Sequence, residues 1–198
     1  MTGGVTFGPE GVHFDRYPYA PAGVPPSGDV ALAAIRDADP TSAPPEIRLR
    51  SGETVFVAAA RRADLAAFCE QHRIPLLRRP DVWGALLEPF LDTQFTEADE
   101  QRTGARLLGA GFTADDTAAI RARFTDVMVA YNFESMLWDW FHLGLSDLLE
   151  ALSGNLSGER HRLAPDEFHT AYWWAMDVAD RTAGQSEPVD YDQNSSQA

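Results

Sequence analysis

The sequence predicts an α+β fold in which a small N-terminal antiparallel β-sheet with one covering helix is followed by a larger all-α helical bundle. Up to residue 58, short segments of alternating apolar and polar residues are separated by Gly and Pro turns, which is typical of β-hairpins. From residue 80 onward, apolar residues recur at the three- and four-residue spacing of helices. Hydrophobic residues make up 44% of the 198 residues, enough for a core.

The β-rich unit is expected to span residues 1–75. Residues 5–14 indicate one hairpin around a Gly-Pro-Glu-Gly turn, and residues 46–58 indicate a second around Ser-Gly. Residues 30–36 suit either a strand or a helix, and we favour a strand that joins the sheet. A helix over residues 61–72 carries one apolar stripe that can cover the second hairpin, formed by Leu65, Phe68, Cys69 and His72.

The helical bundle is expected over residues 80–183. Its helix starts carry residues that cap free backbone N–H groups or lack one, namely Asp81, Thr96 with Asp99, Thr113 with Asp116, and Pro165. Within the first helix Pro89 removes a backbone donor, so we expect a kink near residues 85–88.

Residues 131–152 form the densest run of large apolar side chains, and we interpret them as a buried helix. A continuous helix over residues 114–152 would be about 58 Å long, more than the roughly 40–45 Å span of a compact chain of this size. A break is therefore expected, first at Asn132-Phe133 and second at Gly144. The polar residues of this run fall in one line that meets solvent or lines a small cleft: Asn132, Ser135, Asp139, His142, Ser146 and Glu150.

Charge is distributed unevenly along the chain, whose formal net charge is −14. Residues 1–80 hold nine Arg and nine Asp or Glu, whereas residues 81–198 hold seven Arg against 21 Asp or Glu. An acidic helical part lacks the basic footprint of a nucleic-acid or anionic-membrane binder, and it would attract a basic protein partner. Residues 184–198 are polar and acidic, and we expect them to form a disordered tail.

Composition also bears on compartment and chemistry. All sixteen basic residues are Arg, which is typical of a GC-rich bacterial genome and excludes lysine-dependent mechanisms. The single cysteine, Cys69, cannot form an internal disulfide, and we expect it to pack in the core instead of acting as a reactive thiol. No apolar run reaches the roughly 18–20 residues of a membrane span, and the first residues do not resemble a signal peptide. We therefore expect a cytoplasmic protein.

Four residues have the spacing of metal ligands. Asp139 and His142 are three residues apart, and Glu88 and Asp92 are four apart, so each pair would share one face of its helix. If the two helices face each other, three carboxylates and one imidazole converge, which suits a divalent metal ion or acid–base chemistry. The alternatives are that Asp139 and His142 belong to the solvated face of an amphipathic helix, or that they form a buried structural pair.

Two tryptophans are the candidate partner-binding residues. The adjacent Trp173 and Trp174 point about 100° apart on a helix, so at least one is expected to be partly exposed or to fill a seam between helices. A third possibility is a small-molecule pocket between the β-unit and the helices, lined by Trp83, Phe90 and Trp138.

Motifs of known chemistry are absent from the sequence, which has no dinucleotide or phosphate-binding glycine loop, no Gly-x-Ser-x-Gly, no Cys-x-x-Cys and no His-Glu-x-x-His. We therefore predict a non-catalytic protein-interaction or regulatory module with an acidic helical surface and no cofactor. The alternative is a metal-binding helical bundle or metal-assisted hydrolase that uses Glu88, Asp92, Asp139 and His142.

Overall fold

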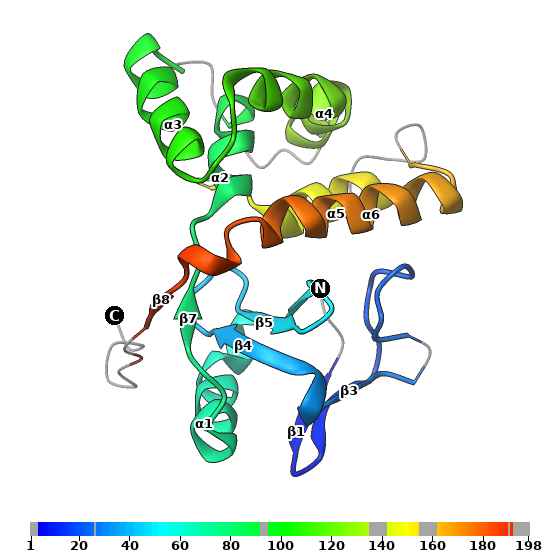
Figure 1. Cartoon of the computed structure of the whole chain (residues 1–198). Helices are drawn as coiled ribbons and strands as arrows, with labels where there is room; N and C mark the ends of the chain where they lie inside the picture. Colours follow the sequence, from blue (N-terminus) through cyan, green and yellow to red (C-terminus); the bar gives the residue numbers. More distant parts are fainter. Residues whose placement is uncertain are drawn as a thin grey trace. The chain divides into compact units, whose positions relative to one another are not determined.

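A computed structural model describes residues 4–25, 27–91, 95–134, 142–154, 162–189 and 191. These residues contain three small antiparallel sheets and six α-helices, so the predicted α+β class is confirmed. The chain divides into two compact units (Figure 1): unit 1 joins Met1–Arg79 to Ser186–Ala198, and unit 2 is Pro80–Gln185. Within the part of the chain described here, no helix has the length and apolar character needed to cross a bilayer.

The first sheet of unit 1 is built on the predicted hairpin over residues 5–14. β1 (Val5–Gly8) pairs antiparallel with β2 (Gly11–Phe14), which also pairs with β3 (Asp29–Ala31). The Pro-rich loop between β2 and β3 is tied to the second sheet, because the Tyr17 hydroxyl accepts a hydrogen bond of 3.1 Å from the backbone N–H of Phe56.

The second sheet has the order β4 (Ile35–Asp39), β5 (Glu46–Leu49) and β6 (Thr54–Phe56). β5 and β6 form the predicted second hairpin, and their turn contains Gly52 at a φ of 88°, a conformation that glycine adopts without strain. The single strand that we favoured over residues 30–36 is wrong. A 3-10 turn over Leu32–Ala34 separates β3 from β4, because the chain passes there from one sheet to the other.

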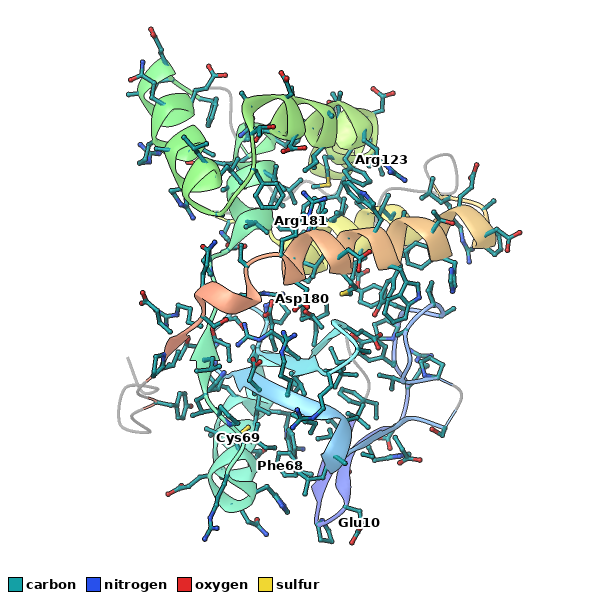
Figure 2. The ribbon with its side chains drawn as sticks, in the orientation of Figure 1. Glu10, Phe68, Cys69, Arg123, Asp180 and Arg181 are labelled. Atoms are coloured by element: carbon teal, nitrogen blue, oxygen red, sulfur yellow. The ribbon has the colours of Figure 1, made fainter. Side chains whose placement is uncertain are left out.

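The predicted helix over residues 61–72 is confirmed as α1 (Arg62–His72). It ends at Arg73, whose left-handed backbone has a φ of 54°. Its buried face consists of Leu65, Ala66, Phe68 and Cys69. Figure 2 labels the last two on this helix.

Unit 1 is completed by a strand from the far end of the chain. β7 (Leu77–Arg78) pairs antiparallel with β8 (Glu187–Pro188), and the N–H of Val189 donates a hydrogen bond of 3.0 Å to the carbonyl of Leu76 (Figure 1). The expected disorder from residue 184 onward is therefore wrong for these residues. Backbone pairing with a distant strand needs no apolar side chains, so local composition carried no signal for it.

An ion pair is buried inside unit 1. Arg48 lies between Ile47 and Leu49 on β5 and therefore points to the opposite face of the sheet from them, yet only 1% of its side chain is exposed. Its guanidinium donates hydrogen bonds to the Asp37 carboxylate on β4 and to the carbonyl oxygen of Leu77. Both faces of β5 are therefore buried, and the arginine is tolerated because its charge is paired.

Unit 2 begins with a short buried helix, α2 (Val82–Leu87), in which every residue is buried. As predicted, Asp81 caps it, and its Oδ1 accepts a hydrogen bond of 2.8 Å from the N–H of Gly84. The kinked helix that we expected here is instead a helix that ends at Leu87 and continues as a 3-10 turn over Glu88–Phe90. Pro89 explains the change, because it has no N–H to donate within an α-helix.

Two longer helices follow, and both begin at the predicted capping pairs. α3 (Glu97–Gly109) starts with the reciprocal hydrogen bonds between Thr96 and Asp99, at 3.0 and 3.2 Å. α4 (Ala114–Glu134) starts in the same way with Thr113 and Asp116, at 3.0 and 3.1 Å. Each pair satisfies backbone N–H groups that the first helical turn leaves free.

The long central helix is interrupted, but not where we placed the break first. α4 continues through Asn132-Phe133, whereas α5 (Leu145–Ser153) begins after Gly144, the second choice. Gly144 has an extended backbone, and its N–H donates a hydrogen bond of 2.8 Å to Asp147. Residues 142–144 are not helical, so the predicted polar stripe does not continue through His142. The last helix of unit 2 is α6 (Pro165–Asp180).

Candidate functional site

A cleft of about 600 Å³ opens in unit 2 between α4, the end of α5 and the start of α6. This volume lies within the range of sites that bind small molecules or anchoring side chains. On α4 and on α6 the lining residues form two adjacent pairs that are three to four positions apart, so each set lies on one face of its helix. They are Arg123, Phe124, Asp126, Val127, Leu152, Leu163, Asp166, Glu167, Thr170 and Ala171.

Apolar side chains form the deep part of the cleft. Phe124, Leu152 and Ala171 are buried, and Val127 and Leu163 are half-buried. A ligand that buries one Leu or Phe side chain against them would gain roughly 1.5–3 kcal/mol from the hydrophobic effect.

An aromatic cluster supports this part of the cleft. The ring centroid of Phe124 lies 5.5 Å from that of Trp174 and 5.9 Å from that of Trp83, and the two tryptophans are 6.1 Å apart. The indole N–H of the buried Trp83 donates a hydrogen bond of 3.0 Å to the carbonyl of Ala175. The cluster therefore joins α2, α4 and α6, and of its three rings Phe124 lines the cleft.

Arg123 stacks on the outer side of this cluster. Its Cζ atom lies 4.7 Å from the ring centroid of Trp174 and 5.7 Å from that of Phe124, within cation–π range. In Figure 2 the label of Arg123 lies on α4, above the ribbon of α6.

Carboxylates dominate the rim. Asp126, Asp166 and Glu167 are exposed, and among the described residues that line the cleft Arg123 supplies the one guanidinium. Glu167 also accepts a hydrogen bond of 3.2 Å from the N–H of Ala164, and so caps α6. The surrounding unit is acidic as well, because residues 80–185 hold 18 Asp or Glu and seven Arg.

A second polar group lies at the start of α2. Nε2 of His142 is 3.1 Å from Oδ2 of Asp81, and both side chains are about half exposed. The hydrogen bond to Asp81 raises the pKa of His142, against the opposing effect of partial burial. Burial alone would raise the pKa of Asp81, but its hydrogen bonds with His142 and Gly84 lower it. The two groups therefore favour an ion pair.

Asp147 lies near this pair. Burial raises its pKa, although the Gly144 N–H and the charge of His142 act in the opposite direction. A separate cavity of about 170 Å³ has both Asp81 and Arg106 in its lining. A cavity of this volume has room for a small ligand only.

Of the four predicted metal ligands, only Glu88 and His142 lie in the described part of the chain, and they bind different partners. Asp92 and Asp139 lie outside that part. The Glu88 carboxylate is bound by α3, through Thr103 and through Arg102 at 3.1 Å, whereas His142 pairs with Asp81. In the described ranges, no three His, Cys, Asp or Glu residues are grouped as a metal ion would require. The four-ligand site stays a prediction.

The two candidate partner-binding tryptophans are both half-buried. Trp174 belongs to the aromatic cluster of the cleft. Trp173 lies edge-on to Tyr172, with ring centroids 5.5 Å apart. Of the residues suggested for a third pocket, Trp83 is 1% exposed and lies in the core of unit 2, and Trp138 is outside the described residues.

The cleft itself was not found by sequence reasoning. Its signal is the helical spacing of Arg123, Asp126 and Val127 on one helix, and of Asp166, Glu167 and Thr170 on another. Each set by itself reads as an ordinary solvated face, and only the placement of α6 beside α4 turns both into one site. Asp81 was recognised as a cap, but not as the partner of His142.

Comparison with known proteins adds no relative, since no family model, no curated protein and no solved structure matches this chain.

Proposed function

We propose that this chain is a non-catalytic protein-interaction module of the cytoplasm, and that unit 2 binds a basic segment of a protein partner in the cleft between α4 and α6. The observation that carries the proposal is the combination of an apolar interior with a rim of three carboxylates, Asp126, Asp166 and Glu167. A segment with one or two apolar residues flanked by arginine or lysine complements both features.

The charge of unit 2 supports a basic partner. With 18 acidic residues against seven arginines, its field attracts cationic segments and repels nucleic acid and acidic proteins. Rim charges mainly accelerate association and select partners, while the buried apolar contacts supply most of the affinity. We therefore expect binding that weakens as salt rises above the roughly 0.1 M at which the screening length is about 10 Å.

The experiment is a selection of random displayed peptides of roughly 12 residues on the full chain. We expect the selected peptides to carry arginine or lysine on both sides of an apolar residue. Their affinity for the D126N/D166N variant should fall several-fold. The matched control is E97Q/D115N, which removes the same charge from the starts of α3 and α4, outside the cleft lining.

Two results would refute the cleft as the binding site. One is selection of acidic or uncharged peptides. The other is an equal loss of affinity in the two double variants, which would mean that basic peptides respond only to the overall charge.

The metal-binding alternative rests on the half-exposed imidazole of His142 beside a carboxylate. Together with Glu88, Asp92 and Asp139, it predicts that Mn²⁺ or Zn²⁺ raises the melting temperature of the full chain. H142Q should abolish that rise. Unchanged melting with either ion would remove this function.

A further inference from the structure

We infer that Arg123, a lining residue of the cleft, occupies in the free chain the position that an arginine of the partner takes in the complex, so that the Trp174 ring beneath Arg123 recognises a guanidinium. The inference deepens the proposed function, on which it rests, by naming the partner side chain that enters the same cleft.

The geometry supplies the receptor for such a group. The Arg123 guanidinium lies over Trp174 at 4.7 Å, a separation at which an aromatic face attracts a cation. Trp174 is held by Trp83 and Phe124, so its ring keeps its position when Arg123 leaves. A planar guanidinium stacks on an indole better than an ammonium does, which makes arginine the preferred partner residue.

The charges around the cleft explain why the exchange is favourable. In the described part of the lining, the charged residues are Arg123, Asp126, Asp166 and Glu167, so Arg123 is the one cation there, and it repels a basic ligand. It is exposed, so its side chain can rotate away without unfolding any helix. An incoming guanidinium regains the stacking on Trp174 and also meets the carboxylates of the rim. Arg123 therefore acts as an internal competitor that weakens and selects ligands.

The test is calorimetric titration of the full chain with the amidated peptide Gly-Arg-Arg-Leu-Phe-Arg-Arg-Gly, and with its counterpart in which lysine replaces every arginine. We expect R123Q to bind the arginine peptide about two- to fivefold more tightly than the unmodified chain, the change that one exposed cation–π contact commands. The lysine peptide should gain less. R123K keeps the charge but stacks less well, so its affinity should lie between the two.

Two further variants separate this mechanism from a general charge effect. R106Q removes one positive charge from α3, outside the lining of the cleft, and should leave the affinity nearly unchanged. In the W174L background, R123Q should bring no gain, since the ring face is gone. W174F, which keeps a ring, checks the same point if W174L does not fold, as judged by circular dichroism.

The outcomes distinguish the inference from the function on which it rests. The inference is supported if R123Q binds the arginine peptide more tightly and R106Q does not, or if R123Q binds it and the unmodified chain does not. Equal or weaker binding by R123Q, or an equal gain from R106Q, overturns the inference and leaves the interaction module standing. No binding by either the unmodified chain or R123Q overturns both.

Discussion

His142 and Asp81 lie at a junction: the imidazole Nε2 is 3.1 Å from Oδ2 of Asp81, whose other oxygen caps α2 by accepting the N–H of Gly84. One carboxylate therefore begins a buried helix and also holds the segment that precedes α5. The other end of α2 is held by Arg121, which donates to the carbonyl oxygens of Ala85 and Leu86 at 3.2 and 3.1 Å. Thus His142, through Asp81, acts at the start of α2, and Arg121 acts at its end.

Replacing Gly84 with alanine is expected to disrupt this junction. A Cβ atom at Gly84 would lie 2.2 Å from Oδ2 of Asp81 and 2.6 Å from Cε1 of His142, so the pair must separate or the cap must move. Loss of a cap alone costs about 1 kcal/mol, and overpacking adds about 1–3 kcal/mol. Because all five tryptophans lie in unit 2, urea unfolding followed by tryptophan fluorescence measures the loss.

The matched control is Gly104 in the interior of α3, where, apart from the neighbouring residues and backbone of its own helix, no atom of the described residues lies within 4 Å of an added Cβ. G104A should stabilise unit 2 by roughly 0.5–1 kcal/mol, since alanine restricts the unfolded chain and favours the helix. A G84A variant that is as stable as G104A would show that the pair does not depend on the close approach at Gly84.

The pair also predicts how the stability of unit 2 depends on pH. The folded pKa of His142 is raised, so its contribution is complete below the ordinary value of about 6.5 and is lost as pH rises through the folded pKa. The folded pKa of Asp81 is lowered, so its contribution is present above about 4 and is lost as pH falls. The pair should therefore stabilise unit 2 most between about pH 4 and 6.5.

Comparison with H142Q isolates this contribution. The difference in unfolding free energy between the unmodified chain and H142Q should shrink from about pH 6 to about pH 8.5. Two neighbouring charges also affect the pKa of His142: that of Asp147 raises it, and that of Arg106 lowers it. A difference that grows toward alkaline pH would contradict the ion pair.

Sequence reasoning located the elements whose causes are local. The cap pairs Thr96–Asp99 and Thr113–Asp116, and both hairpins, were predicted because neighbouring residues decide them. The break after α4 was placed at the wrong residue because Asn132 can continue a helix as well as end one, whereas the cap at Gly144 depends on Asp147. Helical periodicity alone did not show that competing cap.

The features that carry the candidate site depend on distant contacts. The partner of His142 comes from the start of α2, and the ring of Phe124 that lines the cleft packs against Trp83 and Trp174 from two other helices. The strand β8 was hidden for the same reason, since it is defined by pairing with β7. Periodicity along one segment contains no information about which segment packs against it.

Cys69 should be almost unreactive in the folded chain. Burial, with a smaller effect from the charge of Asp37, raises the pKa of its thiol to about 12, and its exposed fraction is 1%. The thiolate is the reacting species, so alkylation by iodoacetamide near pH 8 should be on the order of 1,000-fold slower than in denaturing urea. Mass spectrometry measures both rates. Folded and unfolded rates within tenfold of each other would contradict the buried position.

The buried ion pair between Arg48 and Asp37 should contribute strongly to the stability of unit 1. Replacing Arg48 with glutamine should destabilise unit 1 by about 3 kcal/mol, because the Asp37 carboxylate and the Leu77 carbonyl lose a buried donor. Arg36 still bonds Asp37 at 2.9 Å, which places the expected loss at the lower end of the usual range.

Cys69 lies in unit 1, where there is no tryptophan, so its alkylation across a urea series follows the unfolding of this unit separately from that of unit 2. The double variant R48M/D37L removes both charges and should recover part of the loss, since an apolar pair of similar volume leaves no buried ion without a partner. If R48Q were as stable as the unmodified chain, the pair would have to be hydrated. If the double variant were less stable than R48Q, the shape of the site and not its charge balance would set the stability of unit 1.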